Sequence, residues 1–320
     1  MLLVPSKQII FAQRLNELKR TMLQQALLQA VASLDLKQID DELHRLVQPE
    51  YLNRLARYSL RGEIIFAVPC VIAKNPQLLG YYRLLLGFSQ KDFSKYGLGR
   101  WLKYETTGKW KPARIDSQAL EDLCSLLDEA AYQLLDTLEG ISGTFFHELS
   151  LLTLGSQLQG SYNNLIGNKA AKKLFEILKQ LIKVRTELES FDDHVIQFTN
   201  TSGRRVIIRL AADPDVLVTE QLKTRIRHIL AIEIKGGSDA SNIHNRLGEA
   251  EKTHIKYKQL YPEVQCWTMV GVKELSIQRA RKDSPSTDRF FLLEEIFSGG
   301  PVLEEFVQEL VALLGLRENE

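Results

Sequence analysis

The 320-residue chain lacks several features that would identify a protein class at once. It has only three cysteines, Cys70, Cys124 and Cys266, which are odd in number, widely spaced and set in apolar segments. No C-x-x-C pair or close His/Cys cluster predicts a zinc site, so we expect reduced thiols in a cytoplasmic protein. The first residues lack the basic segment and long apolar core of a signal peptide, and no apolar run approaches membrane-spanning length.

Several catalytic signatures are also missing. The chain has no G-x-S-x-G elbow, no phosphate-binding P-loop and no G-x-G-x-x-G after an expected strand, so use of ATP or a nucleotide cofactor is not predicted. The formal net charge is +1, and any surface for a polyanion must therefore be local. The composition is ordinary for a globular protein, and the length allows one large domain or two modest ones.

The most informative part of the sequence is a pair of short apolar runs. Pro214-Asp215 precedes the first run, and Glu233 and Lys235 lie within the second. Both runs have the composition of buried strands, and the polar stretch 219–228 between them suits a hairpin with a long turn. Because alternate side chains of a strand share a face, Glu233 and Lys235 point the same way, and pairing of the strands would bring Asp215 beside them.

Two carboxylates and an ammonium at the edge of an apolar core suit a hard cation. Mg²⁺ prefers oxygen ligands and is usually held by one or two carboxylates with waters and substrate phosphates. Asp215 and Glu233 are the expected ligands, with the Ile234 carbonyl as a third. Lys235 would orient or help deprotonate the attacking water. The alternative interpretation is an ordinary Glu233–Lys235 ion pair on a solvated face.

Pro214-Asp215 followed by Glu233-x-Lys235 resembles the PD-(D/E)XK nuclease signature. The strings FFHELSLLTLGSQLQGSYNNLIGNKA and AIEIKGGSDASNIHNRLGEAEKTH resemble the XcyI family of type II restriction endonucleases, over roughly residues 140–275. The resemblance implies Mg²⁺-dependent cleavage of double-stranded DNA at a short palindrome, GC-rich and of the CCCGGG type. It makes Asp215 and Glu233 metal ligands and Lys235 the catalytic lysine.

The expected order of elements agrees with this resemblance. We expect an α/β (α+β) fold, with a restriction-endonuclease-like mixed central sheet flanked by helices and a largely helical N-terminal region. Residues 1–139 would serve DNA recognition and dimerisation, and residues 140–320 would form the PD-(D/E)XK core. The expected helices are 9–32, 35–58, 117–138, 144–154, 169–190 and 241–260; the expected strands are 194–199, 206–210, the Asp215 and Glu233 runs and 264–272, with 64–68 either a strand or a buried turn.

Further catalytic candidates lie on the expected helices around the core. Glu148 precedes the core strands, and the resemblance to these nucleases implies that it approaches the metal or its water. The alternative is a half-buried helix glutamate satisfied by a neighbour. His244, Asn245 and Arg246 open the helix after the Glu233 strand, where free N–H groups favour DNA phosphates. His244 would also assist proton transfer. The alternative is a solvated helix face.

The segment 91–114 is the most basic part of the chain, with seven Lys and Arg against two acids and interleaved aromatic residues. Such a segment neutralises phosphates, and Arg and Lys read guanine edges. Arg100, Lys109 and Arg114 are therefore candidate base-readers, unless the segment is a surface loop anchored by its aromatics. Arg279, Arg281 and Lys282, expected in the polar loop after the last strand, are rival candidates.

A palindromic site mirrors two-fold protein symmetry, so we expect a homodimer, functionally paired with a cognate DNA methyltransferase and without membrane contact. Two other interpretations stay open at this point. One is a structure-specific repair or recombination nuclease with the same core, and the other is a non-catalytic helical DNA-binding or adaptor protein.

Overall fold

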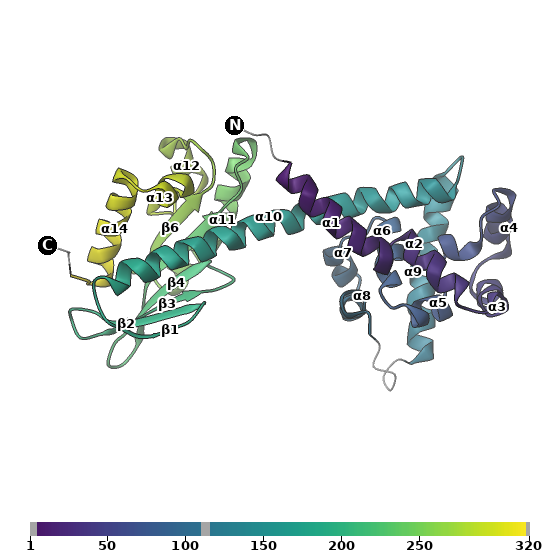
Figure 1. Cartoon of the computed structure of the whole chain (residues 1–320), viewed down its shortest axis with the longest axis horizontal. Coiled ribbons are helices and arrows are strands. Elements are labelled where there is room, and N and C mark those ends of the chain that lie inside the picture. Colours follow the sequence, from purple (N-terminus) through teal and green to yellow (C-terminus); the bar gives the residue numbers. More distant parts are fainter. Residues whose placement is uncertain (1–4, 110–115, 318–320) are drawn as a thin grey trace. The chain divides into compact units, whose positions relative to one another are not determined.

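The computed structural model describes residues 5–109 and 116–317, which fall into two compact units, Met1–Gly160 and Ser161–Glu320. The division lies inside the long helix α10 (Gly143–Lys183), so the start of this helix packs within the first unit (Figure 1). The assignment of recognition to residues 1–139 and catalysis to residues 140–320 stays a prediction. Among the described residues, no helix combines the length and the apolar character needed to cross a membrane.

The first unit is helical throughout its described part, as the sequence predicted. Two expected helices are each divided into two shorter ones. The expected helix 9–32 is interrupted at Met22 and Leu23. The expected helix 35–58 is interrupted before Pro49, because proline is tolerated only in the first turn of a helix. The elements are α1 (Ser6–Thr21), α2 (Gln24–Ala32), α3 (Leu36–Leu46), α4 (Pro49–Arg57), the 3₁₀ turn η1 (Gly62–Ile64), α5 (Pro69–Lys74), α6 (Leu78–Leu85), α7 (Gln90–Lys95), the 3₁₀ turn η2 (Gly99–Trp101), α8 (Leu102–Thr107) and α9 (Ser117–Thr137).

Residues 64–68, for which the sequence left two possibilities, form a buried turn. Side chains from neighbouring helices satisfy its backbone: the Tyr81 hydroxyl donates to the Ile64 carbonyl at 2.7 Å, and the Ala67 N–H donates to Asp128 Oδ1 at 2.7 Å. A buried backbone group without a partner is costly, so these polar side chains are what allow the turn to lie in the core. Asp128 is itself buried, which raises its pKa to about 8.

Helix α10 replaces two expected helices and the glycine-containing loop between them. Gly155 and Gly160 each leave open space where a side chain would stand, and each costs the helix roughly 1 kcal/mol relative to alanine. No proline interrupts this part of the chain, and Leu154 packs in an apolar cluster with α1 and α6 residues that holds the early turns. The loop prediction was wrong because glycine lowers helix stability without forbidding a helix.

The second unit contains a seven-stranded mixed sheet whose strands lie in chain order. Strands β1 to β5 are antiparallel, whereas β5, β6 and β7 run parallel. The strands are β1 (Leu188–Phe191), β2 (Val195–Thr199), β3 (Arg205–Leu210), β4 (Val216–Gln221), β5 (Ile226–Lys235), β6 (Gln265–Val270) and β7 (Arg289–Leu292). Strand β1 had been expected as the end of a helix, and β7 had not been expected.

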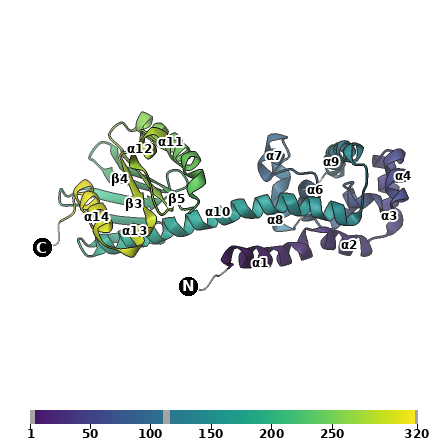
Figure 2. The same ribbon diagram turned by 90° about the horizontal axis from the view of Figure 1, so that it is seen from above.

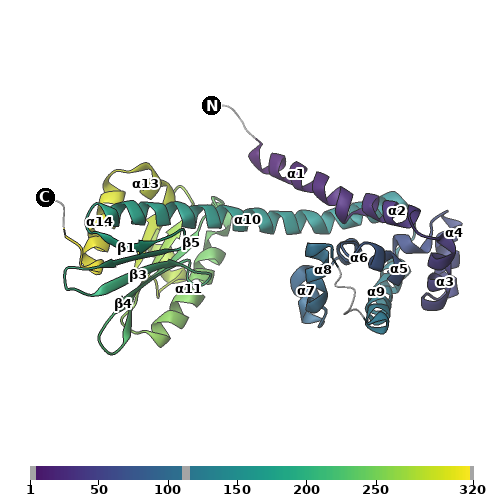
Figure 3. The same cartoon turned by 60° about the horizontal axis from the view of Figure 1, so that its bottom comes forward.

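Helices cover both faces of this sheet, which confirms the expected fold class. The later part of α10 packs on one face with α13 (Leu293–Ser298) and α14 (Pro301–Leu314), while α11 (Ile243–Leu260) and α12 (Ile277–Asp283) pack on the other (Figures 2 and 3). Successive side chains of β5 therefore point alternately to these two faces of the sheet. Ile232 and Ile234 enter the α10 core, and Ala231 and Glu233 face α11.

Candidate active site

The β4–β5 hairpin sets the position of the predicted catalytic residues. Val216 pairs with Ile232 in its antiparallel register, so continuing the same register places Asp215 opposite Glu233. The strands extend further into the polar stretch than expected, and the connecting turn is closed by the Leu222 N–H donating to the Arg225 carbonyl at 2.9 Å. Directly opposed residues share a face of the sheet with neighbouring side chains. The hairpin therefore brings the two carboxylates together.

The contacts at this point are specific. The Ile234 N–H donates to Asp215 Oδ2 at 2.7 Å, and Lys235 Nζ lies 3.0 Å from Glu233 Oε1. The Asp215 N–H approaches Glu233 Oε2 at 3.4 Å. Pro214 ends the regular ladder before β4, and its peptide bond with Asp213 is cis. The Asp215 carboxylate thus accepts from a β5 N–H beyond the last paired residue of β4.

Both carboxyl groups lie in a poorly solvated environment. Burial is the largest cause that raises the pKa of Asp215 and of Glu233, and each is opposed by the nearby Lys235 ammonium. The negative charge of Asp215 further raises the pKa of Glu233. Lys235 is 17% exposed, so its charge is only weakly screened. An added cation at this position would relieve the repulsion between the two carboxylates.

The donor set fits a magnesium ion. In an antiparallel pair the N–H and C=O of one residue point to the same side, so the Ile234 carbonyl faces the same edge as the N–H bound by Asp215. Two carboxylates and one carbonyl leave positions for waters and a phosphate, which is the usual manner of Mg²⁺ binding. Among the described residues, no group of three or more His, Cys, Asp or Glu residues forms a denser metal cage.

Helix α11 contributes further polar groups, which the sequence analysis did not identify. Thr253 Oγ1 lies 3.5 Å from Glu233 Oε1, and Glu249 Oε2 lies 3.8 Å from Lys235 Nζ. Lys256 Nζ lies 2.8 Å from Asp213 Oδ2 and lowers the pKa of that carboxyl group.

Tyr257 completes this face of α11, because its hydroxyl donates to the Asp213 carbonyl oxygen at 3.2 Å. Residues 249, 253, 256 and 257 recur at helical spacing and therefore form one face. That face contacts both halves of the motif. The spacing was a usable signal in the sequence, as was the Asp213-Pro214-Asp215 repeat of acids.

A buried polar contact fixes α11 on the sheet. His254 is fully buried, and its Nε2 lies 2.9 Å from the hydroxyl of Thr268, the β6 residue that pairs with Glu233. Burial lowers the pKa of His254 to about 4, so the ring is neutral at pH 7. A neutral, buried histidine next to Thr253 is a structural anchor that sets the register of α11 against Glu233.

The remaining catalytic candidates lie outside the hairpin contacts. Glu148 is an exposed α10 residue of the first unit, and its predicted role stays a prediction. His244 Nδ1 lies 2.5 Å from Asp283 Oδ2 and so links α11 to α12. Asn245 donates to Asn242 Oδ1 at 2.7 Å, and Arg246 donates to the Gly237 carbonyl just after β5. Arg246 thereby supports the loop that follows the site.

The basic candidates are distributed over both units. In the first unit, Arg100 is exposed with its guanidinium 5.3 Å from the Trp101 ring, and Lys109 is an exposed residue after α8. Arg114 lies outside the described residues. In the second unit, three exposed residues that were expected in a loop lie instead on helix α12: Arg279, Arg281 and Lys282. The loop prediction was wrong because residues 277–283 form two helical turns before β7.

Comparisons with known proteins point to one family. The model of the XcyI restriction endonuclease family matches residues 12–317. The chain is 39% identical to the type II restriction enzyme XcyI of Xanthomonas campestris pv. cyanopsidis, over 98% of this chain and 95% of that enzyme. It is 36% identical to the type II restriction enzyme Cfr9I of Citrobacter freundii, over 98% of this chain and 96% of that enzyme. No solved structure gives a significant match.

Proposed function

Because the chain belongs to the XcyI restriction endonuclease family, we propose that it is a Mg²⁺-dependent type II endonuclease whose active centre is the β4–β5 hairpin. The observation that carries the proposal is the opposition of Asp215 and Glu233, with Lys235 on the same face 3.0 Å from Glu233. The family supplies the reaction class, and the hairpin supplies a site with the chemistry that the reaction needs.

Asp215, Glu233 and the Ile234 carbonyl would hold the magnesium ion. When bound, the ion lowers the pKa of a coordinated water and offsets charge on the scissile phosphate. Phosphodiester hydrolysis requires these effects, since the transition state gains negative charge on oxygen. Both carboxylates have raised pKa values in the absence of a cation, which supports a role as metal ligands.

Lys235 is the residue to which we assign direct contact with the substrate. Its ammonium is a donor of three hydrogen bonds, and Glu233 accepts one of them at 3.0 Å. The other two are available to orient the attacking water or a phosphate oxygen. Glu249 lies 3.8 Å from the same ammonium, and Thr253 contacts the Glu233 oxygen that the ammonium binds, so both would restrict the rotamers of Lys235. A fixed ammonium in a partly buried site stabilises developing charge more strongly than a mobile one in water.

The substrate that we propose is double-stranded DNA with a short GC-rich palindrome of the CCCGGG type. The similarity to two type II restriction enzymes along nearly the whole chain supports DNA as the substrate, and the GC-rich site is what the resemblance to the XcyI family implies. A palindrome presents two equivalent strands, so a homodimer with one hairpin site for each strand is the matching assembly. A cognate methyltransferase would protect host DNA, and both activities belong in the cytoplasm.

A plasmid digest tests the proposal directly. With Mg²⁺, the protein should give discrete fragments whose sequenced ends define one palindrome. Asp215→Asn should abolish cutting while site-specific binding stays close to wild type, because the substitution removes a ligand charge without changing shape. A smear or branch-specific nicks would indicate a structure-specific nuclease. Complete absence of Mg²⁺-dependent cutting would support a non-catalytic DNA-binding protein.

A further inference from the structure

A groove in the first unit lies between α10 and the turn that leads into α7. Its cavity volume is about 600 Å³. Among the described residues that line it, Leu152 is the one large apolar side chain, and the others are glycines, residues with hydroxyl or amide groups, and one lysine. The lining residues are Gly87, Ser89, Gln90, Lys91, Leu152, Thr153, Ser156, Gln157 and Gly160. Gly87 has a φ of 79° and Gly160 has open space beside it, so the rim carries no bulky side chain at either point.

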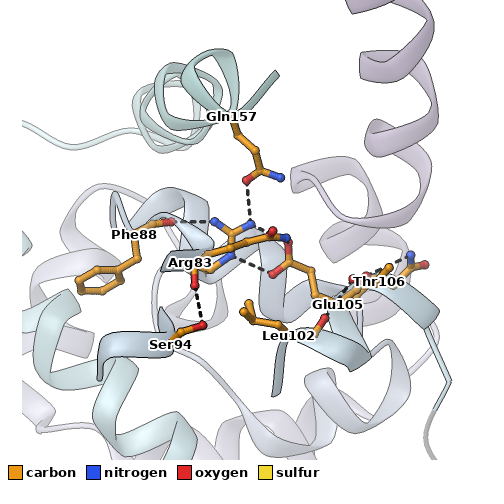
Figure 4. A network of polar contacts seen from close by, with 9 residues as sticks. Arg83, Phe88, Ser94, Leu102, Glu105, Thr106 and Gln157 are labelled. Atoms are coloured by element: carbon orange, nitrogen blue, oxygen red, sulfur yellow. Dashed lines mark hydrogen bonds and ion pairs between the residues drawn. The ribbon is translucent and has the colours of Figure 1, made fainter. Parts of the chain in front are cut away.

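A buried ion pair lies directly behind this groove. Arg83 is completely buried and makes a two-pronged contact with Glu105, at 2.8 Å from Nε and 2.5 Å from Nη2 (Figure 4). The Phe88 carbonyl accepts a third bond from Nη1 at 2.7 Å. A buried ion pair adds little stability, because desolvation offsets its attraction. Its clearest structural consequence is to hold neighbouring polar groups in one orientation.

Those neighbouring groups are the two glutamines of the groove. Gln157 Oε1 accepts from Arg83 Nη2 at 3.0 Å, so the amide nitrogen of Gln157 is turned away from the guanidinium (Figure 4). Gln90 Nε2 approaches Glu105 Oε1 at 3.4 Å, which leaves the side-chain oxygen Oε1 of Gln90 without a hydrogen-bond partner among the described residues. One ion pair therefore orients both amides. Gln157 offers donors and Gln90 offers an acceptor at the same groove.

We propose that this groove reads the edge of a DNA base pair. In the major groove, guanine presents the acceptors N7 and O6, adenine N7 and thymine O4, while cytosine and adenine present an amino donor. Gln157 would donate to a base acceptor, and Gln90 would accept from an exocyclic amine. Lys91, an exposed residue on the rim, would contact a phosphate and fix the register.

The inference rests on the proposed function, since it takes duplex DNA as the substrate. Amide side chains, and not Arg or Lys, would then make the base contacts in this groove. A pre-oriented amide discriminates between bases because the wrong base leaves a desolvated donor or acceptor without a partner. The groove has too few cations to hold phosphates alone, with Lys91 as its single lysine. Base edges are the part of DNA that its chemistry fits.

The decisive variant is Gln157→Glu. Glutamate retains the oxygen that accepts from Arg83 and replaces the amide donors by a second acceptor. Base preference is measured by selecting bound duplexes from a random pool, with Asp215→Asn in the background so that no DNA is cut. We expect a roughly tenfold or larger loss of affinity for the site that the parent selects, with preference relaxed or changed at one base position. The control is Gln133→Glu, which adds the same charge at an exposed α9 residue.

The outcomes are separable. If the Gln157→Glu protein selects the same site with the same affinity, the inference is overturned. It is also overturned if the selected site is unchanged but sedimentation shows a new oligomeric state, because the groove is then a contact between copies. Cleavage is measured separately with Asp215 intact. If that protein never cleaves the selected site, the proposed function is refuted, and the selection alone decides whether the groove reads bases. If Gln157→Glu lowers the unfolding temperature, Gln90→Met tests the proposed acceptor of the groove instead, and the same loss of affinity and base preference is expected.

Discussion

The ion pair between Lys256 and Asp213 gives the sharpest test of the α11 face. Asp213 lies two residues before Asp215, and Lys256 is the α11 side chain that holds it, at 2.8 Å. The pair is half exposed, with side chains 58% and 45% accessible. An ion pair of this kind contributes little to folding, because solvent screens the attraction between its charges. Lys256→Met should therefore lower the free energy of unfolding only slightly.

The effect on cleavage should be larger than the effect on stability. Without Lys256, Asp213 loses its ion pair and keeps the Tyr257 hydroxyl bond to its carbonyl oxygen and a hydrogen bond with Thr253. Loss of a residue that orients a metal ligand typically costs about 10- to 100-fold in metal affinity or activity. We expect a loss of about tenfold in single-turnover cleavage at limiting Mg²⁺, with partial recovery at high Mg²⁺. Lys256→Arg keeps the cation and should retain most of the rate.

Two control variants separate positioning from charge. Lys252→Met removes an exposed lysine from the same helix, one turn earlier. Lys258→Met breaks an ion pair of similar length, 2.7 Å to Asp288, away from the hairpin. The assay is cleavage rate against Mg²⁺ concentration, with thermal unfolding measured in parallel. If Lys252→Met and Lys256→Met lose the same rate, or if the loss does not depend on Mg²⁺, then the positioning role is refuted.

Three further predictions address the core and the site. Lys235→Met should reduce cleavage on the order of a hundredfold at unchanged duplex affinity, measured by single-turnover kinetics and binding isotherms. Gly271→Ala should lower both stability and cleavage, by about 1–3 kcal/mol in unfolding free energy, because its Cβ would lie 2.5 Å from the Gly236 carbonyl; Gly248→Ala, with open space, is the control. Asp128 binds its proton more tightly when folded, with a pKa raised to about 8 by burial, so its stabilising contribution is full below pH 4 and lost as pH rises toward 8. Urea titrations should show wild-type stability relative to Asp128→Asn falling by about 1.4 kcal/mol per pH unit in that window, and parallel curves would refute the assignment.

The hairpin was predictable because two independent signals coincide in it. Short apolar runs on either side of a polar stretch predict buried strands, and Pro214 marks where one of them begins. Helix α11 was predicted to begin at residue 241 and begins at Ile243. The capping residue Asp239 was the signal, and it caps the short turn that leads into the helix. These are local signals. They depend on neighbours in sequence, and tertiary contacts did not reverse them.

The errors arose where a local signal competed with packing. The glycines of α10 indicate a loop when only local propensity is considered, yet the helix continues because Leu154 lies in an apolar cluster with Leu18, Met22, Leu23 and Leu84 from distant parts of the chain. Strand β7 was missed because four residues carry too little periodicity to identify a strand. It forms because β6 offers a parallel edge to pair with. Neither fact is present in a short window of sequence.

The site residues that were missed share a different cause. Thr253 and Lys256 are ordinary helix residues in the sequence, and only the parallel crossover from β5 to β6 brings their face over the hairpin. The register that pairs Val216 with Ile232 brings Asp215 next to Glu233, and Asp213 lies in the turn just before β4, within reach of α11. Asp213 Oδ2 lies 2.8 Å from Lys256 Nζ, and Glu233 Oε1 lies 3.0 Å from Lys235 Nζ. Burial raises the pKa of Asp215 and of Glu233, and the Lys235 charge opposes that rise. Lys256 lowers the pKa of the neighbouring Asp213, so the two lysines together favour the charged form of closely spaced acids at the edge of the core.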